Sequence, residues 1–270
     1  MKKLKSLFLF VLLLSVFGCG QNDIPIKTST IEAALVDAAA GGETYLSLVS
    51  SCPPCATNPW TIGAMGAVAA TVAAEASGLF GGKMNQPNSN GKINNISLKN
   101  EYLLSNNNAE IVGVNHNILL NSINKENNKY DFRIKFESYD ETTWLNLLDK
   151  ANLSGTLLEK KTLISNLKSS NILGELISNT GIYEAKSNSF ETYLIQSKLN
   201  PQSKNDLSRI VTEYKNVAQK GDGISEVNIY LNQEIEKRIK VEEDYTTEEY
   251  SVLIFLSVLK HSNYYWKSNN

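Results

Sequence analysis

Apolar residues recur every three or four positions from residue 109 to the end of the chain, and this spacing constrains the fold more than any other feature. Positions i, i+3, i+4 and i+7 lie on one face of an α-helix, so an apolar stripe there predicts a helix that packs against others. Such stripes occupy residues 112–123, 144–151, 153–167, 207–217 and 224–239. The sequence therefore predicts a mainly α protein with an irregular helical bundle domain.

Two of the predicted helices also carry start signals. Asn200 followed by Pro201 is typical of an N-cap with proline at the first helical position. Thr246 and Glu249 have the spacing of a capping box, in which each side chain bonds the backbone N–H of the other residue. The helix that follows is apolar on nearly all sides between residues 250 and 259, so we expect it to run through the middle of the domain.

The amino terminus has the parts of an export signal. Three lysines lie within the first five residues, and residues 7–17 form an apolar run too short to cross a bilayer, which takes about 20 residues. The run ends in Val16-Phe17-Gly18-Cys19. This motif resembles the lipobox of bacterial lipoproteins, in which an aliphatic residue, a small residue and an obligatory cysteine surround the cleavage site.

The resemblance implies that residues 1–18 are removed and that Cys19 then carries a diacylglycerol and a further acyl chain. Several acyl chains anchor a protein stably where one would not. Gly20 stands where an aspartate would resemble an inner-membrane retention signal, which implies the outer membrane where the cell has one. We expect an envelope protein that faces the periplasm or the exterior. The alternative is an ordinary secretory signal with a chance cysteine.

The sequence suggests five segments. A signal peptide, a tether with a cysteine clip, a Gly/Ala-rich helical segment, an Asn-rich linker and the helical domain occupy residues 1–18, 19–60, 61–82, 83–108 and 109–266. Within the tether we expect a short helix over 31–40, interrupted by Gly41-Gly42, and a loop over 50–60. The helical domain is long enough to bury a core of its own, so we expect it to fold without the first hundred residues.

Two stretches leave alternatives open. Residues 61–80 are small and apolar, which suits a helix that packs closely on the protein or on a second copy. Insertion into a membrane is the alternative, although Glu75 would be costly in lipid. Residues 130–136 alternate polar and apolar side chains as a strand does, but a helix is preferred because the sequence offers no partner strand.

The cysteines other than Cys19 are Cys52 and Cys55, separated by two prolines. One remaining pair in an exported protein predicts a disulfide, here a small structural clip. A redox site would need a strand before the motif and a helix starting within it, whereas these neighbours suggest a loop. A zinc site would need two further ligands. We therefore prefer the disulfide.

The chain has two histidines, His116 and His261, and both fall on apolar faces of predicted helices. One interpretation pairs them as metal ligands or as an acid–base couple, because imidazole serves both roles near neutral pH. The other places each in the core, hydrogen-bonded to a neighbour such as Asn117. We favour the second and expect neither a metal nor another cofactor.

The net charge and the remaining motifs exclude some classes of function but do not identify one. Without residues 1–18 the chain keeps 23 of its 26 basic residues and all 28 acidic ones, so its net charge falls from −2 to about −5. A net negative charge disfavours nucleic-acid binding. No HExxH, GxSxG, phosphate-binding or EF-hand motif occurs. The aromatic tail at residues 262–266 and the Asn115-His116 pair loosely resemble secreted or lipid-anchored bacterial proteins without an established function.

These observations favour a non-catalytic scaffold or binding module at the envelope, attached to the membrane through Cys19 and able to bind an envelope protein. An envelope enzyme with a histidine-containing site is one alternative. A membrane-active, toxin-like protein that acts through residues 61–80 is another. An open pocket holding both histidines would favour the enzyme, and a free helix over residues 61–80 would favour membrane action.

Overall fold

The computed structural model confirms the mainly α fold. It describes residues 25–51, 53–76, 108–126, 140–150, 156–169, 189–220, 223–239 and 245–269. All regular secondary structure within these ranges is helical. Residues 130–136, for which a strand was the alternative, lie outside them.

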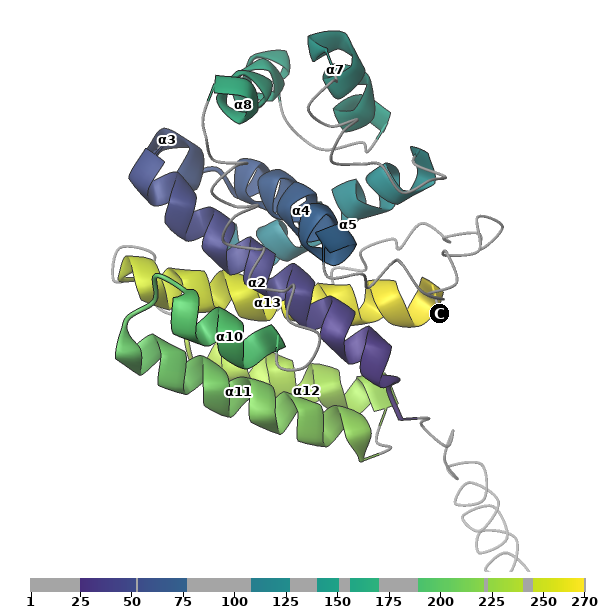
Figure 1. Ribbon diagram of the computed structural model, residues 1–270, viewed down its shortest axis with the longest axis vertical. Helices are drawn as coiled ribbons and strands as arrows, with labels where there is room; N and C mark the ends of the chain where they lie inside the picture. Colours follow the sequence, from purple (N-terminus) through teal and green to yellow (C-terminus); the bar gives the residue numbers. More distant parts are fainter. Residues whose placement is uncertain are drawn as a thin grey trace, which may run out of the picture.

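Four helices form the centre of the molecule: α2 (Thr28–Ser51), α4 (Pro59–Ala76), α5 (Asn108–Glu126) and α13 (Thr247–Asn269). Helix α2 packs against α13 and α4, and α5 packs against α4 and α13, so the four close into a ring. Figure 1 shows α2 and α13 crossing in the middle of the molecule, although they come from opposite ends of the chain. The core therefore depends on contacts between residues far apart in sequence.

Two smaller groups of helices flank this ring (Figure 1). On one side lie α10 (Ser189–Gln196), α11 (Pro201–Gln219) and α12 (Gly223–Glu236), with α11 packed against α12 and α12 against α13. On the other side α7 (Glu141–Lys150) packs against α8 (Leu157–Ser169) and touches α5.

Glycines let the central helices approach one another closely. A Cβ atom built on Gly66 of α4 would lie 3.2 Å from the Cα atom of Gly41 in α2. One built on Gly63 would lie 2.7 Å from the carbonyl oxygen of Val112 in α5. Residues 60–70 are buried, so the preferred interpretation, a helix packed on the protein, is confirmed for this part of the Gly/Ala-rich segment. No described helix is both long and apolar enough to span a membrane.

The expected tether is wrong for residues 28–51, because this segment is the continuous, largely buried helix α2. The expected interruption at Gly41-Gly42 is also wrong. Glycine lowers helix propensity by about 1 kcal/mol, but here its small size admits Val258 and Ser251 of α13, and this packing offsets the loss.

The loop expected over residues 50–60 is wrong as well. Pro53 begins the short helix α3 (Pro53–Ala56), and Pro59 begins α4. Proline fits the first turn of a helix, since the N–H that it lacks has no partner there in any case.

The boundary expected at residue 109 does not separate an independent domain. Helices α5 and α13 bury their faces against α4 and α2, so residues 109–266 do not supply a complete core of their own. The expectation for α13 is confirmed, since Phe255 and Leu259 are fully buried. Both predicted start signals are also confirmed by the hydrogen bonds of Asn200 and of the Thr246–Glu249 capping box.

Candidate functional site

The two histidines lie in the interior, where α5 faces α13. His116 is fully buried and His261 is nearly so. His116 points toward α4, where its Cδ2 atom would lie 3.4 Å from a Cβ atom on Gly66. His261 lies against Gly113 of α5. Neither forms the open pocket that the enzyme interpretation requires.

His261 belongs to a buried ionic cluster that joins α5 to α13. Glu110 Oε2 accepts a hydrogen bond from Lys260 Nζ at 2.9 Å and lies 3.1 Å from His261 Nε2. Burial alone would raise the pKa of Glu110, but the hydrogen bond and charge of His261, together with the charge of Lys260, lower this pKa below its ordinary value. The cluster therefore holds a buried carboxylate in its charged form.

His116 belongs to a neighbouring hydrogen-bond network with Asn117 and Ser262. Its Nδ1 atom lies 3.2 Å from Asn117 Oδ1, which also accepts a hydrogen bond from Ser262 Oγ. Burial lowers the pKa of His116 to about 4, so its ring is neutral at physiological pH. The core interpretation of this histidine, with Asn117 as its partner, is confirmed.

Two buried carboxyl groups on α2 have raised pKa values. Asp37 accepts a hydrogen bond from Trp266 Nε1 at 2.8 Å, and burial raises the pKa of Asp37 to about 7 despite that bond. Burial likewise raises the pKa of Glu43 to about 7, while nearby Tyr193 and Lys198 act in the opposite direction with smaller effect. These acids are enclosed by helices, so their shifts reflect packing rather than contact with a substrate.

The cysteine predictions remain untested by the structure. Cys55 is buried just after the start of α3. Cys19 and Cys52 lie outside the described residues, so both the lipid anchor and the disulfide stay predictions. Among the described residues, no group of three histidine, cysteine, aspartate or glutamate side chains is placed to hold a metal ion.

An open cavity of about 640 Å³ lies where α11 and α13 begin and α12 ends. The first turns of α11 line it with Asn200, Gln202, Ser203 and Asp206. Asn200 Oδ1 accepts a hydrogen bond from the Ser203 backbone N–H at 2.8 Å. This cap fixes the first turn of α11 and therefore the wall of the cavity.

The opposite wall comes from the end of α12 and the start of α13. Lys237 and Arg238 follow α12 directly, and Thr246 and Glu249 form the capping box of α13. In that box, Glu249 Oε2 accepts a hydrogen bond from the Thr246 N–H at 3.0 Å. Short-range sequence signals thus build both helix starts that border the cavity.

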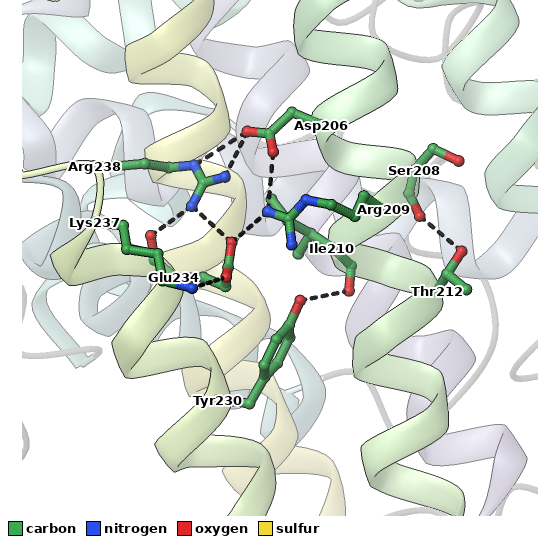
Figure 2. Close-up of polar contacts among 9 residues, drawn as sticks. All are labelled: Asp206, Ser208, Arg209, Ile210, Thr212, Tyr230, Glu234, Lys237 and Arg238. Carbon is green, nitrogen blue, oxygen red and sulfur yellow. Dashed lines mark hydrogen bonds and ion pairs between the residues drawn. The ribbon is translucent and has the colours of Figure 1, made fainter.

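An ion-pair network beside the cavity locks α11 to α12 (Figure 2). Arg238 Nη2 lies 2.5 Å from Asp206 Oδ2, and Arg238 Nη1 lies 2.8 Å from Glu234 Oε2. Arg209 Nη2 approaches the same Glu234 oxygen at 2.7 Å. Burial would raise the pKa of Glu234, but hydrogen bonds from Arg209, Lys237 and Arg238 outweigh it and lower this pKa to about 2. Glu234 therefore stays charged over the physiological pH range, and the network joins α12 to α11.

No protein-family model, curated protein or solved structure matches the chain.

Sequence reasoning missed the cavity, although it identified two of its borders. Asn200 and the Thr246–Glu249 pair were recognised as helix starts, and that signal was local. The two helix starts meet beside Lys237 and Arg238 because of the way α11, α12 and α13 pack. No sequence pattern indicates this packing.

Proposed function

We propose that this chain is a non-catalytic binding module, held at the cell envelope by lipid on Cys19, and that the cavity between α11, α12 and α13 is its binding site. The cavity is the observation that supports this function best. Its volume of about 640 Å³ falls within the roughly 300–1,000 Å³ of small-molecule sites. Ion pairs between α11 and α12 hold one wall in place, and a preorganised wall reduces the entropy lost when a ligand binds.

The charged groups that line the cavity favour binding over catalysis. The two acidic side chains in the described lining already have partners within the protein. Here Asp206 is engaged by Arg238, and Glu249 is engaged by the Thr246 N–H. Both histidines lie in the interior, away from the cavity lining. These charged groups therefore shape the cavity.

The position of the cavity suits a protein anchored at its amino terminus. The Ile26 N–H donates a hydrogen bond to the carbonyl of Ala218, near the end of α11. The cavity lies at the other end of the same helix, whose 19 residues span about 28 Å. The described chain thus begins beside the end of α11 that lies opposite the cavity, and this placement favours an accessible cavity when Cys19 carries the anchor.

Site-specific photo-crosslinking tests the binding function. A photoreactive amino acid replaces Gln202 at the cavity in the full-length protein, expressed in its own cells. The control carries the same group in place of Gln219, an exposed glutamine at the far end of the same helix. We expect a crosslinked product from position 202 that position 219 does not give. Identical products from both positions, or none from position 202, would contradict a binding site here.

The anchor is tested separately with Cys19→Ser. This variant should lose acylation and accumulate as precursor or as a soluble exported form. The wild-type protein should partition into the detergent phase. Equal partitioning of the mature forms of both proteins would show that the lipobox interpretation is wrong.

A further inference from the structure

Among the described residues that line the cavity between α11, α12 and α13, the charges balance one another. Asp206 and Glu249 are acidic, and Lys237 and Arg238 are basic. An anionic ligand would meet two carboxylates, and a cationic one would meet an ammonium and a guanidinium group. Neither an anionic nor a cationic ligand would therefore be attracted clearly more than it is repelled. A neutral ligand is the class that this lining suits.

The polar groups also alternate between donors and acceptors of hydrogen bonds. Asn200 and Gln202 each offer both, because a side-chain amide has a carbonyl oxygen and an NH2 group. Lys237 Nζ donates one hydrogen bond to Glu234 and keeps further N–H donors for a ligand. A ligand hydroxyl can do both at once, so a ligand rich in hydroxyl groups can satisfy neighbouring donors and acceptors together.

Ser203 adds a hydroxyl group to the cavity lining. The residue is only 8% exposed, yet it lines the cavity. Among the described residues its hydroxyl has no hydrogen-bond partner, since only its backbone N–H is engaged, with Asn200. Because Ser203 lines the open cavity, its hydroxyl is placed to exchange a water molecule for a polar group of a ligand.

Tyr245 and Val252 add an apolar patch to the same lining. A sugar ring has an apolar C–H face beside its hydroxyl groups, and an aromatic ring next to a methyl-bearing side chain suits such a face. The volume of about 640 Å³ has room for two sugar rings. We therefore propose that the cavity binds a neutral, polyhydroxylated ligand of mono- to disaccharide size, an assignment that rests on the binding function proposed above.

Calorimetric titration of the mature full-length chain tests this ligand class. The probes are neutral mono- and disaccharides that cover the common hexose and N-acetylhexosamine stereochemistries, with inorganic phosphate and spermidine as the charged comparisons. We expect at least one neutral saccharide to bind and the two charged probes to bind more weakly. Ser203→Ala should weaken the saccharide about tenfold, as the loss of one hydrogen bond predicts.

The matched control is Ser208→Ala on the same helix, at an exposed position that does not line the cavity. It should leave saccharide affinity unchanged. Tighter binding of phosphate or spermidine, equal loss in both serine variants, or no binding across the saccharide panel would each overturn the ligand class. If the Gln202 crosslink still forms in those cases, the binding function stands and only the ligand class is wrong. If it is also missing, the binding function fails as well.

Discussion

Lys260 Nζ of α13 lies 2.9 Å from Glu110 Oε2 of α5, and each side chain is only 1% exposed. His261, the next residue on α13, approaches the same carboxylate oxygen. Removing one member of such a buried pair leaves the other charge unpaired in a low-dielectric interior, and that penalty often exceeds the net value of the intact pair.

Single substitutions in this pair should therefore destabilise the protein more than the double substitution. Lys260→Met and Glu110→Leu should each lower the free energy of unfolding by about 3–5 kcal/mol, because each leaves a buried group without its partner. The double variant Glu110→Leu/Lys260→Met should lose less than either single variant. Urea denaturation of the four proteins measures this coupling. Additive losses would show that the two side chains do not interact.

Asp37 should make stability fall as the pH rises. Its pKa is raised from 3.8 to about 7, so the folded state holds a proton that the unfolded state releases between these values. Its contribution is complete below about pH 4 and is lost as the pH rises through about 7. Asp37→Asn cannot titrate but can still accept the Trp266 hydrogen bond.

We therefore expect Asp37→Asn to gain stability relative to the wild type as the pH rises from 4 to 8, by about 2–4 kcal/mol. Urea denaturation at pH 4, 6 and 8 measures the difference. Glu43 and His116 titrate in both proteins, so their effects largely cancel. A difference that stays constant with pH would contradict the burial of an ionisable Asp37.

The burial of α13 predicts a steep loss on truncating its central side chains. Phe255 is fully buried, so Phe255→Ala should cost about 3–5 kcal/mol, a large share of the roughly 5–15 kcal/mol by which domains are stable. Ile195→Ala is the apolar control, because Ile195 is 77% exposed and its loss should stay within about 0.5 kcal/mol. Thermal denaturation compares the melting temperatures of the two variants with that of the wild type. Equal melting temperatures for both variants would indicate that α13 is an exposed docking face.

Gly63 should tolerate no larger side chain. Alanine normally stabilises a helix by up to about 1 kcal/mol relative to glycine, but here its Cβ atom would lie 2.7 Å from the Val112 carbonyl oxygen. We expect Gly63→Ala to lose about 1–3 kcal/mol through overpacking. Gly42→Ala should lose less, because its nearest neighbour, Ser251 Oγ, would be 3.2 Å away. Denaturation midpoints rank the two, and a Gly63→Ala protein as stable as the wild type would contradict the close approach of α4 to α5.

Features set by neighbours in sequence were predictable. The caps at Asn200 and at Thr246–Glu249 were recognised because each signal lies within four residues of a helix start. The burial of Phe255 followed from a helix that is apolar on nearly all sides. These local signals led correctly to a mainly helical fold.

Features set by distant packing were not predictable. Helix α2 is buried on most sides, and even Asp37 and Glu43 point into the interior, so its sequence has no clear polar face to give a periodic pattern, and the sequence suggested a tether. Glu110 and Lys260 lie 150 residues apart, and no spacing rule relates them. The cavity likewise forms only when three helix ends meet.

The fold described above requires α2 and α4 to pack inside the same body as α5 and α13. Circular dichroism of a truncated chain that begins at Gly91 tests this most directly, with residues 20–270 as the control. Without α2 and α4, the apolar faces of α5 and α13 lose their main partners. We predict that the truncated chain aggregates or shows no cooperative thermal melt, while the control melts in one transition. A soluble, helical truncated chain with a single melt close to that of the control would contradict this fold.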